Sequence, residues 1–281
     1  MTESRTILVT GATDGLGRAL ALDLAAGGEA LILHGRDRAR LDRLAAEVAG
    51  LGAPAPRTVL ADLGDLAQVR RMAAEVRDTA DRLDVLVNNA GIGGGEPDGV
   101  TRRTSADGHE LRFAVNHLAG FLLTLELLPL LRASAPARVV FVASLGQQAI
   151  DFDDLMLTRG YEGARAYRQS KLAQVMTAFH LAERVPADEV TFTSLHPGTY
   201  MPTKLVRDWI GRSVDTVGTG VAATRRLVVG DEVAGVTGRF FDRTEEARAD
   251  EQAYDPAARA LLWERSLRLT GAPQLVEGRC R

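Results

Sequence analysis

The sequence is poor in the residues that build disulfides and metal sites. Its one cysteine, Cys280, is the penultimate residue, so an intrachain disulfide and a cysteine-based metal site are excluded. The histidines show no metal-ligand spacing. They are His34, His109, His117, His180 and His196. We therefore predict no metal, and the lack of a disulfide framework makes a reducing cytoplasm the expected location.

A signal peptide, a long apolar run and an excess of one charge are also missing. The first apolar run, Ile7-Leu8-Val9, is too short for a secretory signal, and no stretch is expected to reach membrane-spanning length. A net charge of -3 predicts no nucleic-acid partner. The chain has 281 residues, 46% of them hydrophobic, which is enough for one large core. We predict a single α/β domain over residues 1–281.

The first motif is a glycine turn between a predicted strand and a predicted helix. The strand over residues 6–10 runs into Gly11-Ala12-Thr13-Asp14-Gly15-Leu16-Gly17, and an apolar helical pattern follows. In this context glycines let the backbone approach a pyrophosphate, and the helix N-terminus offers unpaired N–H groups. The alternative is an ordinary left-handed turn with spare glycines, because the spacing is not G-x-G-x-x-G.

Arg36 ends the second predicted strand, which covers residues 30–35. In a dinucleotide-binding fold the residue at this tip faces the adenosine ribose. A carboxylate there suits a free 2′-hydroxyl, whereas an arginine suits a 2′-phosphate. Arg36 therefore favours NADP(H) over NAD(H), although Asp14 in the glycine turn argues against a nearby phosphate. Arg38 and Arg40 are interpreted as the solvated face of the next helix, Arg40 in particular.

Asp62 and Leu63 close the third predicted strand, over residues 57–61. A carboxylate at this place can hold the adenine amino group of a dinucleotide. It can also cap the helix predicted over residues 66–80, and the two roles are compatible.

Asparagines mark the next two elements. The fourth strand, over residues 83–87, is followed by Asn88-Asn89-Ala90-Gly91. We expect Asn88 to tie neighbouring turns together and residues 89–91 to allow a ligand to approach the backbone. Asn116 lies inside a long helix predicted over residues 107–132. An asparagine is locally unfavourable in a helix interior, which suggests that Asn116 has a functional role.

Three further polar residues have a chemistry that fits an oxidoreductase. The fifth strand, over residues 138–143, delivers Ser144 to its carboxyl end, the edge where open parallel sheets bind ligands. A helix predicted over residues 161–184 places Tyr167 and Lys171 one turn apart on one face. A neighbouring ammonium favours the phenolate and so lowers the pKa of a tyrosine. Taken alone, the pair also fits two partly exposed helix residues.

In this order the motifs resemble the short-chain dehydrogenase/reductase superfamily. The resemblance rests on residues 10–17, Asn88-Asn89-Ala90-Gly91, Asn116, Ser144 and Tyr167 with Lys171, and it covers nearly the whole chain. Several stretches are similar to the retinol-dehydrogenase-like branch in particular. They are residues 105–110, 167–173, 195–198 and 255–266.

The resemblance implies a fold and a division of catalytic roles. The fold is a Rossmann-type, doubly wound parallel sheet of strand order 3-2-1-4-5-6-7, flanked by helices. Tyr167 is implied as the general acid for ketone reduction or the base for alcohol oxidation, and Lys171 as the group that lowers its pKa and binds the nicotinamide ribose. Ser144 is implied to hold the substrate oxygen, and Asn116 to position a water that links Lys171 to solvent.

The same resemblance and the local patterns together assign the cofactor contacts. They are Gly11, Thr13, Asp14, Gly15, Leu16, Gly17, Arg36, Asp62, Leu63, Asn89, Ala90, Gly91, Tyr167, Lys171, Pro197, Gly198 and Thr199. Two departures from the superfamily matter. The segment between Ser144 and Tyr167 is long, and its residues 147–164 are expected to form a pocket wall. Pro202 occupies the place where the superfamily often has a threonine for the nicotinamide carboxamide, which leaves Thr203 as a candidate.

We expect an NADP(H)-dependent oxidoreductase that reduces a ketone or aldehyde, or oxidises the alcohol, of a bulky apolar small molecule. The apolar helical face within residues 205–214 makes residues 199–215 a candidate substrate lid, with a surface helix as the alternative. Two other functions stay open: a biosynthetic enzyme performing a cyclisation, epimerisation or dehydration, and a non-catalytic dinucleotide sensor. A homodimer, a homotetramer and a monomer are all compatible with the resemblance.

Overall fold

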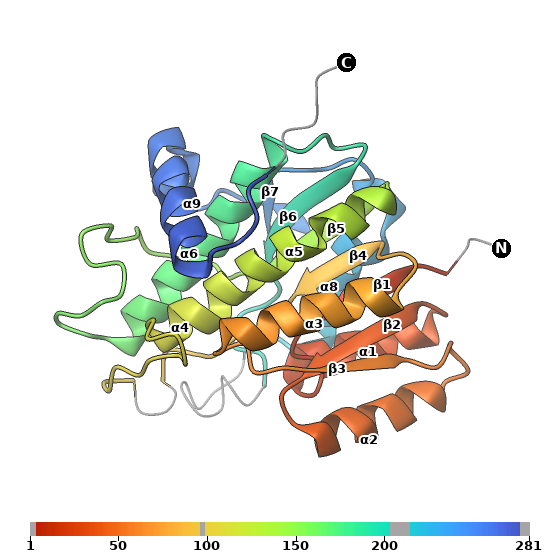
Figure 1. Cartoon of the computed structure of the whole chain (residues 1–281). Coiled ribbons are helices and arrows are strands. Elements are labelled where there is room, and N and C mark those ends of the chain that lie inside the picture. Colours follow the sequence, from red (N-terminus) through yellow and green to blue (C-terminus); the bar gives the residue numbers. More distant parts are fainter. Residues whose placement is uncertain (1–3, 96–98, 203–213, 276–281) are drawn as a thin grey trace.

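The computed structural model describes residues 4–95, 99–202 and 214–275, and its described part is built around one eight-stranded sheet (Figure 1). In chain order the strands are β1 (Thr6–Val9), β2 (Ala30–Gly35), β3 (Arg57–Leu60), β4 (Val85–Asn88), β5 (Ala137–Val142), β6 (Val190–His196), β7 (Arg239–Asp242) and β8 (Glu245–Glu246). Their spatial order is β3-β2-β1-β4-β5-β6-β7-β8. The predicted order of the first seven strands is confirmed, and β8 is an addition that pairs antiparallel with β7.

Helices cover both faces of the sheet (Figure 1). One face carries α1 (Gly15–Ala26), α2 (Arg38–Ala49) and α8 (Val217–Val229). The other carries α3 (Leu66–Thr79), α5 (Ala119–Ala133), α6 (Gly163–Ala182) and α9 (Pro256–Thr270). Short helices complete the described part: α4 (Leu111–Phe113), η1 (Ala114–Leu118), η2 (Asp231–Val233) and η3 (Glu251–Tyr254). Because parallel strands joined by helices are buried on both faces, the strands are nearly continuous apolar runs.

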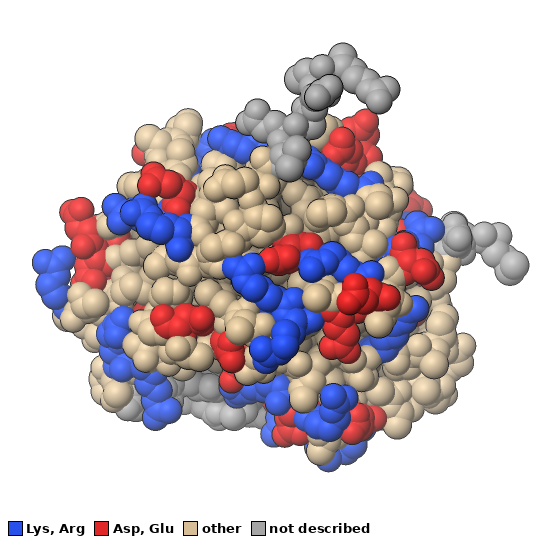
Figure 2. All heavy atoms as spheres, viewed as in Figure 1, with Lys and Arg blue, Asp and Glu red and all other residues tan. Residues whose placement is uncertain are grey.

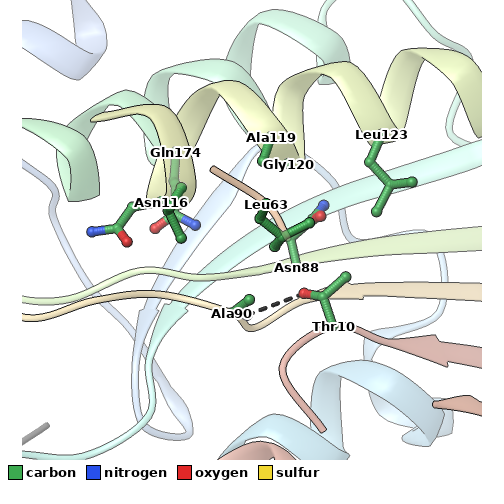
Figure 3. A pocket seen from close by; sticks show the side chains of 10 residues that line it. Thr10, Leu63, Asn88, Ala90, Asn116, Ala119, Gly120, Leu123 and Gln174 are labelled. Atoms are coloured by element: carbon green, nitrogen blue, oxygen red, sulfur yellow. Dashed lines mark hydrogen bonds between the residues drawn. The ribbon is translucent and has the colours of Figure 1, made fainter. Parts of the chain in front are cut away.

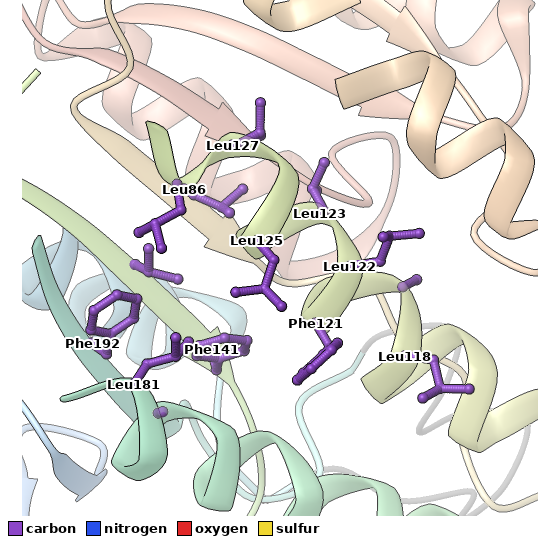
Figure 4. Packing of buried hydrophobic residues seen from close by; sticks show 14 of the residues in the cluster. Leu86, Leu118, Phe121, Leu122, Leu123, Leu125, Leu127, Phe141, Leu181 and Phe192 are labelled. Carbon is purple, nitrogen blue, oxygen red and sulfur yellow. The ribbon is translucent and has the colours of Figure 1, made fainter. Parts of the chain in front are cut away.

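The core consists of two apolar clusters, one on each side of the sheet. Consecutive strand residues point to opposite faces. Ile7 on β1 accordingly packs with the α1, α2 and α8 side, and Leu8 packs with the α3, α5 and α6 side. Figure 4 shows part of the second cluster, where Phe121 of α5 and Phe141 of β5 face the space between the sheet and the helices. Ile7, Leu8, Phe121 and Phe141 are at most 1% exposed.

The long helix around Asn116 differs from the predicted one in two ways. It begins at Leu111 rather than at residue 107, because the Glu110 carboxylate caps it by accepting the N–H of Phe113 at 2.6 Å. A π-helical turn, Ala114–Leu118, then interrupts the α-helical pattern at Asn116. Such turns are rare and occur frequently at functional sites.

The same helix corrects the expectation about membrane-spanning length. Among the described residues, Leu111–Ala133 is one helix of 23 residues that is long and apolar enough to cross a membrane by length and composition alone. Of its most apolar window, 72% is buried inside the protein. The apolar character is therefore used for packing against β4, β5 and α3, as Figure 4 shows for Leu122 and Leu125.

Charged side chains of both signs are interspersed on the face of the molecule that carries α3, α5 and α9 (Figure 2). Arg70 and Arg77 of α3 both form ion pairs with Glu126 of α5, at 2.5 Å and 3.0 Å. Exposed pairs of this kind contribute little stability each, about 0–1 kcal/mol. This face therefore presents mixed charge rather than a single basic or acidic patch.

Candidate active site

A pocket of about 940 Å³ opens along the carboxyl ends of the parallel strands. Its lining includes all of the predicted cofactor contacts, from Gly11 in the glycine turn to Thr199 after β6, and also Ser144. Asn116 is the one predicted site residue that does not line it. The volume lies at the upper end of the range for small-molecule sites, about 300–1,000 Å³, which suits two ligands side by side.

The glycine turn is held against the neighbouring strand end by Asn89. The side-chain amide of Asn89 donates to the backbone oxygen of Thr10 at 2.8 Å. A Cβ on Gly17 would lie 2.3 Å from the Gly11 oxygen and 2.5 Å from that amide, so glycine is required for α1 to approach the turn. Gly11 itself has a φ of 64°, a conformation that favours glycine. Asn89 was predicted as a ligand contact and is also a structural tie.

His34 is a functional residue that the sequence reading missed. It lies near the end of β2, is 3% exposed, and lines the pocket. Its Nδ1 accepts the N–H of Gly11 at 3.1 Å, so Nε2 carries the proton and donates to the oxygen of Ala61 at 3.1 Å. Burial lowers the pKa of His34 to about 4, and the ring is therefore neutral at pH 7. His34 fixes the glycine turn relative to β3.

At the adenosine end, the structure corrects the interpretation of the arginines after β2. Arg36 is exposed and lines the pocket, as predicted. Arg40, expected to face solvent, also lines the pocket and lies 3.5 Å from the carboxylate of Asp14. Arg38 pairs with Asp42 on the outer side of α2 and does not line the pocket. Two cations, Arg36 and Arg40, thus lie at this end together with several carboxylates, of which Asp14 is paired with Arg40.

The proposed capping role of Asp62 is wrong. The side chain of Asp65, not that of Asp62, accepts the N–H groups of Ala67 and Gln68 at the start of α3. Asp62 instead accepts the N–H of Gly64 at 2.8 Å, which closes the turn after β3 and leaves the residue on the pocket wall. Because Asp62 and Asp65 are three positions apart, the local pattern did not distinguish them.

Ser144 and Tyr167 come together at the catalytic end of the pocket. Burial raises the pKa of Tyr167, a hydrogen bond from Ser144 lowers it by less, and the nearby Tyr200 raises it further. The net pKa of Tyr167 is raised, so the expected lowering is not seen. The physical reason is that Tyr167 is buried, while Lys171 Nζ lies 5.7 Å from the Tyr167 ring centre and donates to Val142. The phenol therefore keeps its proton at neutral pH.

Lys171 is 5% exposed, and burial lowers its pKa to about 7. Its Nζ donates to the backbone oxygen of Val142 at 2.8 Å and to Oε1 of Gln174 at 3.0 Å. The contact with Val142 ties α6 to the carboxyl end of β5. An ammonium has three donors, so one N–H remains for a ligand in the pocket that Lys171 lines.

Asn116 lies behind the large pocket, in the π-helical turn, and is 2% exposed. Its side chain accepts the N–H of Ile92 at 2.8 Å and donates to Ser170 Oγ at 2.9 Å. It lines a small cavity together with Gln174 and Asn88 (Figure 3). The amide therefore joins α6 to the loop after β4, and the water-positioning role stays a prediction.

The loop after β6 is fixed by a network that the sequence reading did not find. The N–H of Thr199 donates to Asp215 at 2.6 Å, and His196 Nε2 lies 3.0 Å from Thr199 Oγ1. Arg243 forms an ion pair with Asp215 at 2.6 Å. This holds residues 197–201 against the pocket. Thr203 and most of the candidate lid, residues 203–213, lie outside the described residues.

The segment between Ser144 and Tyr167 does not form the expected pocket wall, because none of residues 147–164 lines the pocket. Ile150 is 4% exposed and packs in the core, and its N–H donates to Gln252 Oε1 at 2.6 Å. Gln147 accepts the N–H of Asp250 at 2.9 Å. The segment is thus paired with the chain around η3, which the sequence pattern could not indicate.

The residues present fit a nicotinamide dinucleotide. The N-terminus of α1 opens on the pocket through Gly15 and Leu16, and the positive end of a helix dipole suits a pyrophosphate, although the N–H of Gly15 is accepted by the Asp14 carboxylate at 2.7 Å. Arg36 and Arg40 supply positive charge at the adenosine end, and Lys171 supplies a donor at the catalytic end. The described residues contain no group of three or more His, Cys, Asp or Glu that could hold a metal.

Comparisons with known proteins agree with this geometry. A family model described as short chain dehydrogenase matches residues 5–211. The chain is 35% identical over 300 residues to Retinol dehydrogenase 13 of Homo sapiens, covering 97% of this chain and 87% of that one. It is 42% identical over 213 residues to DnrU of Streptomyces sp. (strain C5), named for a daunorubicin C-13 ketoreductase activity, covering 74% and 68%.

Solved structures show the same likeness. The Pseudomonas aeruginosa RhlG/NADP active-site complex matches with a TM-score of 0.68 at 26% sequence identity, covering 86% of this chain and 95% of that chain. The predicted site residues, from Gly11 to Thr199, all lie inside the range that the family model matches.

Proposed function

The chain belongs to the short-chain dehydrogenase/reductase family of NAD(P)-dependent oxidoreductases, and from that premise we propose that it reduces a ketone or aldehyde with NADPH. The observation that carries the proposal is the state of Tyr167. Its phenol is hydrogen-bonded to Ser144, holds its proton at neutral pH, and faces a pocket whose other end is a dinucleotide cradle. A protonated acid next to an oxygen-binding hydroxyl suits proton donation to a carbonyl.

Each residue has a role in that reaction. NADPH, when bound, supplies the hydride. Ser144 holds the carbonyl oxygen and stabilises the negative charge that develops on it. Tyr167 donates its proton to that oxygen, and Lys171 stabilises the resulting phenolate electrostatically and holds the cofactor ribose. Asn116 keeps α6 and the loop after β4 at a fixed separation through Ser170 and Ile92.

NADPH is favoured over NADH by the two arginines at the adenosine end. Arg36 and Arg40 line the pocket, where a 2′-phosphate can accept charge-assisted hydrogen bonds. The Asp14 carboxylate, 3.5 Å from Arg40, opposes this preference in part. The NADP-bound RhlG complex supports the same choice. The preference thus depends on the balance between these three side chains.

An apolar substrate fits the surface around Ser144. Leu145 and Tyr200 line the pocket and are 45% and 38% exposed, and Met201 lies next to them on the wall. Exposed apolar side chains beside a catalytic group suit a ligand that buries them. A bulky apolar carbonyl compound is accordingly the proposed substrate class. The cytoplasmic location and the oligomeric state stay predictions.

Replacement of the acid tests the proposal directly. Purified protein should consume NADPH with a panel of aromatic and polycyclic ketones, followed at the nicotinamide absorbance. Tyr167→Phe should reduce kcat by about 10²–10⁴-fold or more, because general acid catalysis is lost, while the NADPH Kd stays within about threefold. Full activity in Tyr167→Phe would refute the assignment. Product formed from a substrate with no net change in nicotinamide absorbance would favour a non-redox reaction instead.

A further inference from the structure

Gln174 lies one turn after Lys171 on α6 and is 2% exposed. Its Oε1 accepts a hydrogen bond from Lys171 Nζ at 3.0 Å. The other acceptor that Nζ reaches among the described residues is the backbone oxygen of Val142. Gln174 does not line the large pocket, so its contact is with the lysine and not with a ligand.

Gln174 also borders the small cavity, which measures about 10 Å³ and which Asn88 and Thr10 line from the opposite side (Figure 3). Asn88 donates through Nδ2 to Thr124 at 3.0 Å, while its buried Oδ1 has no hydrogen-bond partner in the described part of the chain. A space of about 10–15 Å³ with polar partners is enough for one water. Gln174 and Asn88 thus border the same small cavity.

An amide has one end that accepts and one end that donates hydrogen bonds. The Oε1 end of Gln174 accepts from the ammonium of Lys171, so the NH₂ group is the other end of the amide. The opposite orientation would place N–H donors against an ammonium. Lys171 thus selects one orientation of the Gln174 amide.

We propose that Gln174 is a positioning residue for Lys171 and anchors the ammonium through its side-chain oxygen. The catalytic meaning of this contact rests on the proposed function, but the contact determines the state of Lys171 whether or not a ketone is the substrate. Gln174 sets how much of Lys171 is charged near neutral pH.

The charge on Lys171 is balanced by neutral dipoles. Burial lowers its pKa, and no carboxylate of the described residues lies in ion-pair contact with Nζ. The titratable groups that face it are Tyr167, on the same helix, and His196, at the end of β6. His196 is neutral at pH 7, because burial lowers its pKa to about 4. Each acceptor that is hydrogen-bonded to Nζ therefore has a large influence on the pKa of Lys171.

The test measures the titration of Lys171 directly. The chain contains two lysines, Lys171 and Lys204, so protein labelled with ¹³C-lysine gives two side-chain signals by NMR, and Lys204→Arg assigns them. In Gln174→Met, of similar length but without the acceptor, the pKa of Lys171 should fall by about 1–2 pH units. In Gln174→Glu it should rise by about 1–3 pH units, because a carboxylate favours the charged form.

Gln169 offers a matched control on the same helix. It is 3% exposed and donates through Nε2 to the oxygen of Ala149, without contact to Lys171. Gln169→Met should lower the unfolding temperature as Gln174→Met does, yet leave the Lys171 titration within about 0.3 pH units of wild type, since no acceptor on Nζ is removed. In the active enzyme, the pH profile of kcat/KM should shift with Lys171 in the two Gln174 variants only.

The outcomes separate this inference from the proposed function. Opposite shifts of Lys171 in Gln174→Met and Gln174→Glu support the inference even if no ketone is reduced by the wild type, a result that would count against the proposed function alone. An unchanged Lys171 titration in both folded variants would overturn the inference while leaving the reductase activity intact. If Gln174→Met does not fold, the direction of the shift in Gln174→Glu decides alone.

Discussion

The two ends of the pocket differ in how much their charged and polar side chains are exposed to solvent. At the adenosine end, charged side chains stand in solvent: the side chains of Arg40 and Asp14 are 50% and 52% exposed. At the catalytic end, Lys171 and Ser144 are 5% and 8% exposed. Interactions between exposed charges are screened by salt, whereas buried groups change their pKa values instead. The first end selects a ligand by charge, and the second sets protonation states.

The difference has a consequence for how sensitive each end is to substitution. An exposed pair such as Arg40 and Asp14 can be changed at small energetic cost, because solvent replaces the lost partner. A buried hydrogen-bonded group leaves its partner without solvation when it is removed, which costs more. Substitutions are therefore expected to have larger effects at the catalytic end, and the following predictions test that order.

Next to Tyr167→Phe, the largest effect is expected for Ser144→Ala. Loss of the hydroxyl removes the donor to the developing oxyanion, which should lower kcat by about 10²–10³-fold. It also removes the hydrogen bond that lowers the pKa of Tyr167. Steady-state kinetics with NADPH and a ketone that the wild type reduces measure this loss of kcat. Ser194 on β6 provides the control, because it is fully buried and its hydroxyl has no partner among the described residues. A kcat in Ser144→Ala equal to that of Ser194→Ala would contradict the comparison.

The second prediction concerns the loss of folding stability at low pH that His34, at the dinucleotide end, is expected to cause. The pKa of His34 falls from 6.5 in the unfolded chain to about 4 in the folded protein, so folding favours the neutral ring. The stabilisation is present above pH 6.5 and is lost as the pH falls toward 4, by about 3 kcal/mol in the free energy of unfolding. Urea unfolding at pH 7 and pH 4.5 should show this loss.

His34→Gln should reduce that pH dependence, because glutamine cannot gain a charge in this range. The other buried histidines, such as His117 with a pKa lowered to about 3, keep their own contributions in both proteins. An identical slope of stability against pH in His34→Gln and wild type would show that His34 is not a source of the acid sensitivity.

The sequence predicted the elements better than the contacts between them. The bounds of β2 agree with the structure, because it is a largely apolar run that ends at a glycine followed by a charged residue. Pairing of the segment after Ser144 with η3 was missed, since Ile150 and Gln252 are far apart in the chain and neither shows a local signal. The two-residue β8 is likewise too short to give a pattern.

The same distinction applies to the site. Motif residues were found because each belongs to a short local pattern: Gly17 to the glycine turn, Ser144 to the end of a strand, and Tyr167 to a pair with Lys171 one helical turn away. His34 was not found, because its role depends on Gly11 and Ala61, which reach it only through strand pairing. The raised pKa of Tyr167 was also missed, since burial is a property of the folded chain. Local sequence patterns therefore predict which residues form the site, whereas the packing of the folded chain determines their pKa values.

At the exposed end, Arg36→Ala should weaken NADPH binding by about tenfold, the lower range for one hydrogen bond to a charged group in solvent. The Kd of NADH should stay within about twofold, because it lacks the phosphate. Titrations at low and high salt should show that the loss shrinks as salt rises. Arg38→Ala is the control two positions away, since Arg38 does not line the pocket. An equal loss for NADH would contradict a phosphate-specific role.

The smallest effect is expected for Asp14→Asn. Asparagine keeps the acceptor that Asp14 offers to the N–H of Gly15 at the start of α1, so stability should change little. The substitution removes a negative charge beside Arg40, which should tighten NADPH binding by about twofold to fivefold at low salt and leave NADH unchanged. Fluorescence titration of both cofactors measures this. Weaker NADPH binding in Asp14→Asn would mean that the carboxylate organises Arg40 for the phosphate rather than repelling it.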